Sequence, residues 1–167
     1  MAKGTGLPVP SRVAERAATS YIISTDGCWI TTYKLGVTGY GRISWRASDH
    51  KKHGSNVHRA AFQYWNGQPC GAENEVDHLC HDPATCDGGV DCPHRGCVRP
   101  EHLGESTHRE NTMRSNSLTA LGAQQTCCSN CSGPFTEYDR GGKRFRACLP
   151  CRAANLRKHR AARSAVN

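Results

Sequence analysis

Three residues in the middle of the chain, Asp77, His78 and Asn111, have the side chains that hydrolysis of a phosphodiester bond requires. That reaction needs a base to activate water and a hard cation to stabilise the charge that develops on the phosphate and the leaving oxygen. His78 suits the base, because an imidazole with the ordinary pKa of about 6.5 is mostly neutral at physiological pH. The amide oxygen of Asn111 and the carboxylate of Asp77 suit Mg²⁺ or another divalent cation. We therefore expect a metal-dependent hydrolytic site.

The segments that must position these residues predict a strand, a loop, a second strand and a helix. Residues 74–79 are typical of a short strand, and residues 103–106 of a second extended segment. Thr107 and Glu110 have the spacing of a capping box, which predicts the start of a helix, and Asn111 falls in its first turns. The base is therefore expected on the first strand and the amide ligand on the helix.

Strand periodicity divides the stretch from Asp77 to Cys80. Successive side chains of a strand point to opposite faces, so His78 and Cys80 are expected on one face and Asp77 on the other. His78 would then serve the chemistry and Cys80 the scaffold. A role for Asp77 as a cation ligand requires the strand to twist.

Eleven cysteines and nine histidines in 167 residues indicate bound metal. The N-terminus has no charged-then-apolar leader, which disfavours disulfides, and thiolate with imidazole is the ligand set of tetrahedral zinc. Only 37% of the residues are hydrophobic and 7% aromatic, so the core is expected to be modest and to need such support. One candidate set lies in the loop after the first predicted strand and consists of His81, Cys86, Cys92 and His94, with Cys70 as a substitute. Free or redox-linked thiols are the alternative for this set.

A second candidate set consists of two Cys-x-x-Cys pairs near the C-terminus. Paired knuckles at this spacing predict a zinc site in place of a core, with two short strands at 135–138 and 143–145 between them. The four expected ligands are Cys128, Cys131, Cys148 and Cys151. Cys127 is an alternative to its neighbour Cys128. Residues 115–125 predict a polar connector before this module.

The net charge of +8 predicts a polyanionic partner, through counterion release and electrostatic steering. Residues 31–35 and 40–46 have strand-forming composition and predict a hairpin, in which Arg42, Ser44 and Arg46 line one face. A two-stranded ribbon of this kind fits the major groove of DNA, and an ordinary solvated sheet face is the alternative.

Further basic residues follow the hairpin, flank the expected active site and fill the C-terminal tail. Residues 140–163 contain nine Lys or Arg residues and no Asp or Glu, and their last part predicts a basic helix that contacts phosphate. A solvated tail is the alternative. The candidate DNA-binding residues are Arg42, Arg46, Lys51, Lys52, Arg114, Arg157, Lys158 and Arg160.

The central part of the chain resembles the HNH, or ββα-metal, nucleases, and among them the His-Cys box homing endonucleases and phage-type HNH proteins. The resemblance covers about residues 26–115 and is carried by Cys28, Asp77-His78-Leu79-Cys80, Cys97-x-x-Pro-x-His102-Leu103 and Glu110-Asn111. It implies that His78 is the general base, that Asn111 binds the catalytic metal and that Arg59 contacts the scissile phosphate. It also implies one structural zinc ion, bound by Cys28, Cys80, Cys97 and His102.

The insertion between Cys80 and Cys97 is longer than in the compact His-Cys box. We expect two structural zinc ions, one in the set that begins with Cys28 and one in the C-terminal four-cysteine set. A third, in this insertion, is left open. Asp77 matches the Asp-His pair of many HNH enzymes, whereas enzymes of the His-Cys type manage without that carboxylate.

The expected fold class is α+β, with a zinc-stabilised ββα-metal core, an N-terminal antiparallel β-ribbon and a small C-terminal zinc-ribbon-like module. Short helices are expected at 11–20 and 57–65. The expected domains are an N-terminal segment at 1–25, a nuclease domain at 26–117, a four-cysteine zinc module at 126–152 and a basic tail at 153–167.

These features together predict a Mg²⁺-dependent endonuclease that hydrolyses double-stranded DNA, of a homing, phage or restriction type. The alternative is a zinc-dependent DNA-binding regulator without catalysis, and the choice between monomer and homodimer stays open. No apolar run approaches the roughly 18 residues that span a bilayer. The expected location is intracellular, either cytoplasmic or nucleoid-associated, or nuclear in a eukaryote, without secretion.

Overall fold

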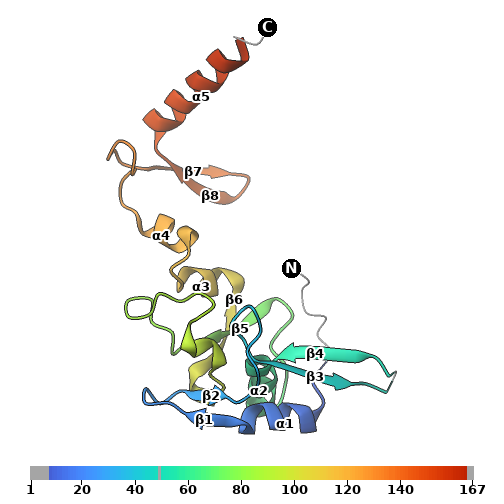
Figure 1. The fold of residues 1–167 in the computed structure, drawn as a ribbon. Helices are drawn as coiled ribbons and strands as arrows, with labels where there is room; N and C mark the ends of the chain where they lie inside the picture. The colour runs from blue at the N-terminus through green and yellow to red at the C-terminus, as the bar shows by residue number, and fades with distance from the viewer. Residues whose placement is uncertain (1–7, 49, 165–167) are drawn as a thin grey trace. The chain divides into compact units, whose positions relative to one another are not determined.

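The computed structural model describes residues 8–48 and 50–164 (Figure 1). The chain forms two compact units, Met1–Ala120 and Leu121–Asn167. Within the described residues, the strands pair into four two-stranded antiparallel sheets, and helices precede, separate and follow these sheets along the chain. The expected α+β class is confirmed at this level. None of the described helices is both long enough and apolar enough to cross a membrane.

The first unit contains α1 (Ser11–Thr19), β1 (Tyr21–Ile23), β2 (Trp29–Thr31), β3 (Arg42–Arg46), β4 (Lys52–Asn56), α2 (Val57–Asn66), β5 (Asn74–His78), the 3-10 helices η1 (Pro93–Gly96) and η2 (Pro100–His102), β6 (Leu103–Thr107) and α3 (His108–Met113). Helix α4 (Leu118–Gln124) crosses the boundary between the units. The second unit continues with β7 (Thr136–Arg140), β8 (Lys143–Ala147) and α5 (Leu149–Ser164). The two helices expected in the N-terminal half are confirmed as α1 and α2.

The core of the first unit is built mainly from alanine and valine, with Ile43, Phe62 and Leu103 as its larger members. Helices α1 and α2 pack against each other through alanines, and Ala17, Ala18, Ala60 and Ala61 are completely buried. The largest fully buried side chains among the described residues are Val57, Val98, Cys28 and Cys97. Because hydrophobic stabilisation grows with the apolar area removed from water, a core of this size contributes little compared with one built from leucine and phenylalanine.

The predicted hairpin between residues 31–35 and 40–46 is wrong in its pairing. Strand β3 pairs instead with β4, from Arg42 opposite Asn56 to Arg46 opposite Lys52. Only one isolated bridge, Leu35 opposite Gly41, joins the two predicted runs across a tight turn. The residues after Gly41 pair with β4 instead. Lys52, one of the candidate DNA-binding residues, thus lies in strand β4.

The face of β3 follows the predicted alternation. Arg42, Ser44 and Arg46 are exposed, whereas Ile43 is buried and Trp45 is half-buried. In Figure 1 the β3–β4 ribbon extends away from α1 and α2.

The predicted strand, loop, strand and helix around residues 74–111 are confirmed. Strand β5 pairs antiparallel with β6, with His78 opposite Leu103. The capping box is present: the Thr107 hydroxyl accepts from the Glu110 backbone N–H, and the Glu110 carboxylate accepts from the Thr107 N–H. Helix α3 therefore starts where the sequence placed it.

The second unit follows its predicted pattern in the hairpin and in the basic helix. Strands β7 and β8 pair antiparallel, and α5 carries the basic residues of the tail. The connector at 115–125 differs from the prediction, because it contains helix α4. The Ser117 hydroxyl accepts from the Ala120 backbone N–H, an N-cap contact that starts this helix.

Candidate functional site

Three groups of Cys and His residues come together among the described residues, and in each group the four ligand atoms lie within 4.8 Å of one another. The core cluster is Cys28, Cys80, Cys97 and His102; the loop cluster is His81, Cys86, Cys92 and His94; the C-terminal cluster is Cys128, Cys131, Cys148 and Cys151. These are the three sets that the sequence singled out. Each of them could hold a metal ion. Cys70 and Cys127, the two alternatives, lie outside the three clusters.

The distances within the clusters fit a tetrahedral zinc ion. Zinc–ligand bonds of about 2.3 Å to sulfur and 2.0 Å to nitrogen place two sulfurs about 3.8 Å apart, and sulfur and nitrogen about 3.5 Å apart. In the core cluster, Nδ1 of His102 is 3.5 Å from Sγ of Cys28 and 3.6 Å from Sγ of Cys97. The corresponding sulfur–nitrogen distances in the loop cluster are 3.6 and 3.5 Å, with two sulfurs 3.6 Å apart. Two sulfur–sulfur distances in the C-terminal cluster are 3.7 and 3.3 Å, far longer than a disulfide bond.

Backbone hydrogen bonds assemble the core cluster from distant segments. The N–H of Val98, next to Cys97, donates to the carbonyl of Trp29, next to Cys28, over 2.8 Å. The N–H of Leu79 donates to the carbonyl of His102 over the same distance, which brings the turn with Cys80 to the cluster. Cys80 lies in this turn rather than in β5, so strand periodicity, which was expected to place it beside His78, does not apply to it.

In the core cluster, ionisation of Cys97 is favoured and ionisation of Cys28 and Cys80 is opposed. Burial, and then the neighbouring Cys97, raises the pKa of Cys28 to about 12. The hydrogen bond with Cys97 and burial raise the pKa of Cys80, whereas the hydrogen bond from Cys80 lowers the pKa of Cys97 to about 5. A divalent cation favours thiolate at every one of these positions, so this donor set fits a bound dication.

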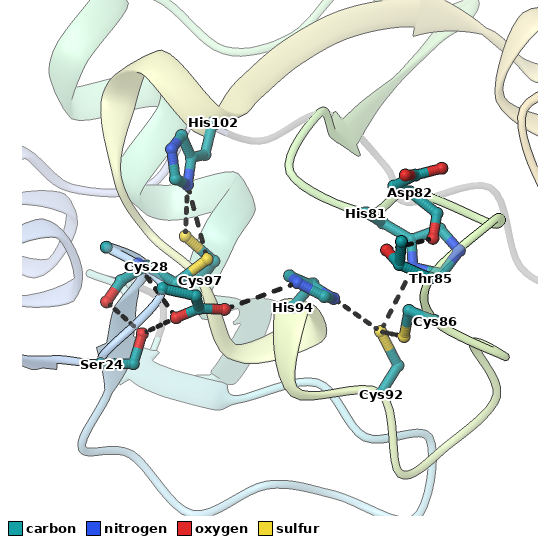
Figure 2. A network of polar contacts seen from close by, with 12 residues as sticks. Ser24, Cys28, His81, Asp82, Thr85, Cys86, Cys92, His94, Cys97 and His102 are labelled. Atoms are coloured by element: carbon teal, nitrogen blue, oxygen red, sulfur yellow. Dashed lines mark hydrogen bonds and ion pairs between the residues drawn. The ribbon is translucent and has the colours of Figure 1, made fainter.

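Asp26 connects the core cluster with the loop cluster. Its Oδ2 atom is 3.7 Å from Nε2 of His94, while Nδ1 of His94 faces the sulfur of Cys92 at 3.5 Å. The single hydrogen of the Ser24 hydroxyl is shared between two acceptors, the Asp26 carboxylate and the Cys28 carbonyl, which lies 2.9 Å from the hydroxyl oxygen. Figure 2 shows this chain of contacts running between the two clusters. A carboxylate behind a histidine ligand fixes the orientation of the ring and makes the ligand more basic.

A cavity of about 320 Å³ lies beside the loop cluster. Its lining includes His78 and Asn111, the predicted base and the predicted cation ligand, together with Asp77, Tyr40 and Arg95. The ring of Tyr40 stacks near that of His78, with 5.9 Å between ring centroids. The structure thus brings together side chains from β5, from α3 and from the insertion between Cys80 and Cys97.

His78 ends β5 and is almost completely buried. Its Nε2 atom is 3.1 Å from the backbone carbonyl oxygen of Cys97. A carbonyl can only accept, so Nε2 carries the proton and Nδ1 keeps its lone pair. Burial lowers the pKa of His78 to about 4, from the ordinary 6.5. The imidazole is therefore neutral at physiological pH, in the tautomer that can accept a proton at Nδ1.

Asn111 is held by a residue that the sequence did not single out. Its Nδ2 donates to Oε2 of Glu75 over 2.6 Å, which leaves its amide oxygen for another partner. Although burial opposes ionisation, the hydrogen bonds from Asn111 and His108 hold the pKa of Glu75 below its ordinary value. Glu75 therefore fixes the amide in one orientation.

Asp77 makes an ion pair with Arg114, with 2.7 Å between Oδ2 and Nη1. Glu75 and Asp77 share one face of β5, and Asn111 and Arg114 are three residues apart around the end of α3. These spacings place each pair on one face of its own element, but the contacts between the two pairs also require the packing of α3 against β5. Asp77, expected to bind the cation, and Arg114, expected to bind DNA, are paired with each other here.

Arg59 does not line the cavity. It lies on α2 and is half-buried. Burial raises the pKa of Glu75, the hydrogen bonds from Asn111 and His108 lower it, and the charge of Arg59 adds a smaller lowering effect. The remaining candidate DNA-binding residues are exposed, on or next to the β3–β4 ribbon and on α5: Arg42, Arg46, Lys51, Lys52, Arg157, Lys158 and Arg160.

No protein-family model, curated protein or solved structure matches this chain. The fold and the site define a mixed α+β protein with three Cys/His clusters that could hold metal ions, one of which adjoins a cavity lined by a neutral histidine and an oriented asparagine.

Proposed function

We propose that the protein is a zinc-stabilised endonuclease that hydrolyses double-stranded DNA with Mg²⁺ or another divalent cation. The observation that carries this proposal is that His78 and Asn111 line one cavity and are each tied by a single hydrogen bond. The bond at His78 leaves Nδ1 to accept a proton, and the bond at Asn111 leaves the amide oxygen to bind the cation. The resemblance to HNH and His-Cys box nucleases assigns the same two residues the same two roles.

In the proposed mechanism, Nδ1 of His78 takes a proton from a water molecule, whose oxygen attacks the phosphorus atom of the scissile phosphodiester. The bond from phosphorus to the leaving oxygen breaks, and that oxygen takes a proton from solvent. The carbonyl of Cys97 accepts from Nε2–H and so keeps the neutral ring in the tautomer that can take the proton of the attacking water. The amide oxygen of Asn111 would hold a divalent cation, which supplies positive charge beside the phosphate and the leaving oxygen. Glu75 keeps the amide oxygen turned away from itself and toward that position.

The core cluster supports this chemistry through its backbone. Cys97 provides both a sulfur to the cluster and the carbonyl that orients His78. Zinc bound there would fix the base as well as the fold, in the way that groups beyond the reacting shell tune many metal sites.

The β3–β4 ribbon supports binding to a duplex. Residues opposite each other in an antiparallel pair lie on the same face, so Lys52 joins Arg46, and Asn56 joins Arg42, on the exposed side. The Arg42 guanidinium donates to the Asn56 side chain over 2.9 Å. A two-stranded ribbon with this basic face matches the width of the DNA major groove.

Incubation with supercoiled plasmid and Mg²⁺ tests the proposal. The wild type and His159→Ala, a control on the exposed face of α5, are expected to nick or linearise the DNA. His78→Ala and Asn111→Ala are expected to cut more slowly by about 10²–10⁴-fold, the usual contribution of a general base. Mg²⁺ is omitted rather than chelated in the blank, so that the Cys/His clusters keep their metal.

The outcome also separates the endonuclease from a DNA-binding regulator without catalysis. A regulator shifts the plasmid in a gel and leaves it covalently intact. Cleavage by His78→Ala at the wild-type rate would contradict the assignment of the base.

A further inference from the structure

Arg95 is a cation within the cavity that no carboxylate of the described residues neutralises. It lies in η1, directly after His94 of the loop cluster, and its side chain lines the same cavity as His78 and Asn111. Of the two carboxylates that line this cavity, Asp77 is paired with Arg114, and Asp87 is beyond ion-pair distance of Arg95. Among residues 8–48 and 50–164, no other carboxylate pairs with Arg95 either.

Two contacts hold the guanidinium in place. Nη1 of Arg95 donates to the carbonyl of Thr38 over 2.5 Å, and the guanidinium carbon lies 4.7 Å from the centroid of the Tyr40 ring. A guanidinium has five N–H donors in one plane, so these contacts leave several donors for an anion. Phosphate matches such a planar edge with two parallel hydrogen bonds.

The insertion also packs directly against the turn before β3. Gly39 has a φ of 77°, and a Cβ atom there would lie 2.1 Å from the carbonyl oxygen of Val90 and 3.0 Å from Cδ of Arg95. The turn can therefore touch the insertion only without a side chain at this position. Contact with this turn and the neighbouring loop cluster together determine where Arg95 lies.

We propose that Arg95 binds a backbone phosphate of DNA inside the cavity, and that the metal-bound loop cluster fixes Arg95 for this contact. The identification of this phosphate as the scissile one rests on the proposed endonuclease function. The insertion between Cys80 and Cys97 then forms part of the substrate site as well as a second cross-link of the fold. This role differs from that of Arg59, which lies outside the cavity.

The test measures binding and cleavage separately. Binding of a short DNA duplex is measured with Ca²⁺ in place of Mg²⁺, and single-turnover cleavage with Mg²⁺. Arg95→Gln keeps the aliphatic stem beside Gly39 and Tyr40, and it is expected to weaken binding by about tenfold, because one charge-assisted bidentate contact is lost. Its cleavage rate is expected to fall further. Arg95→Lys restores the charge without the planar edge, so it should recover part of the binding and little of the cleavage.

Cys86→Ser tests the role of the loop cluster. It is expected to lower the bound zinc by one ion per chain, to preserve the far-ultraviolet circular dichroism spectrum, and to cause the same binding defect as Arg95→Gln. The double variant should bind no worse than either single variant, because both changes act on one contact. Normal binding by Cys86→Ser with one zinc ion lost would overturn the positioning role of the cluster.

The remaining outcomes distinguish this inference from the endonuclease proposal. If Arg95→Gln binds and cleaves as the wild type does, the phosphate assignment is overturned. If the wild type binds the duplex through Arg95 but never cuts, the phosphate site stands and the endonuclease falls. If the wild type neither binds nor cuts, both fall.

Discussion

The backbone carbonyl of Cys97 lies 3.1 Å from Nε2 of His78, so one residue links the core cluster to the predicted base. The sulfur of Cys97 faces the other cluster ligands, and its carbonyl holds the imidazole. The orientation of His78 and the integrity of the cluster are therefore expected to change together.

Substitution Cys97→Ser is expected to remove one metal ion per chain and to unfold the first unit. Cys97 is completely buried in a small core, so a metal ion bound at the core cluster would supply much of the stability. The loss should amount to several kcal/mol, as for other structural metal sites. Metal content by elemental analysis and melting by circular dichroism check this. Cys70→Ser, outside every cluster, is the control, and equal melting of the two variants would contradict a structural role for the core cluster.

Substitution Glu75→Ala is expected to raise the Mg²⁺ concentration needed for cleavage. Without the acceptor of its Nδ2 group, Asn111 no longer holds its amide oxygen in one orientation. Loss of such a supporting group typically costs about 10–100-fold in metal affinity or activity. Cleavage rates across a Mg²⁺ series measure the effect. Glu105→Ala, which removes a carboxylate bonded to Asn74 and Gly71 instead, should leave the Mg²⁺ requirement unchanged.

The pair Asp77 and Arg114 is suited to a double-mutant cycle. If Asp77 acts by holding Arg114, the single variants Asp77→Ala and Arg114→Ala should each slow cleavage, and the double variant should be no slower than either. The coupling in stability is expected to be about 1 kcal/mol, since half of the Arg114 side chain is exposed. Additive effects on cleavage would instead indicate separate roles, with Asp77 on the cation and Arg114 on DNA.

Substitution Gly39→Ala is expected to loosen the insertion that carries the loop cluster. Two costs combine: a left-handed backbone, about 1–2 kcal/mol for a residue with Cβ, and the overlap with the carbonyl of Val90. Gly67→Ala is the matched control, because its φ of 72° is similar and its Cβ would meet nothing within 4 Å. Competition with a zinc chelator should remove one ion from Gly39→Ala faster than from Gly67→Ala. Equal release would show that the close contact at Gly39 does not support the cluster.

Local signals in the sequence predicted much of this structure. Cysteine and histidine are rare residue types, so the loop set and the C-terminal set stand out by composition and spacing, whereas the core set was implied by the resemblance to HNH nucleases; all three sets come together. The capping box of Thr107 and Glu110 depends on two residues three apart and was equally visible. Signals of this kind act over one turn of chain or through composition alone.

Contacts that depend on how elements pack were not predicted. Strand β4, with the sequence Lys-His-Gly-Ser-Asn, has little strand propensity and forms because β3 offers it a partner. The bond between Glu75 and Asn111 requires the position of α3 against β5, and the place of Arg95 in the cavity requires the path of the whole insertion. Neither can be deduced from spacing along the chain.

Because the core of the first unit is small, its folding would depend on the concentration of the metal that it binds. Two of its four largest fully buried side chains, Cys28 and Cys97, belong to the core cluster rather than to an apolar interior. With zinc as the ligand of the folded state, each tenfold change in free zinc changes the free energy of unfolding by about 1.4 kcal/mol per bound ion. The folded fraction of the protein, and any activity that depends on it, would then follow the zinc supply of its surroundings.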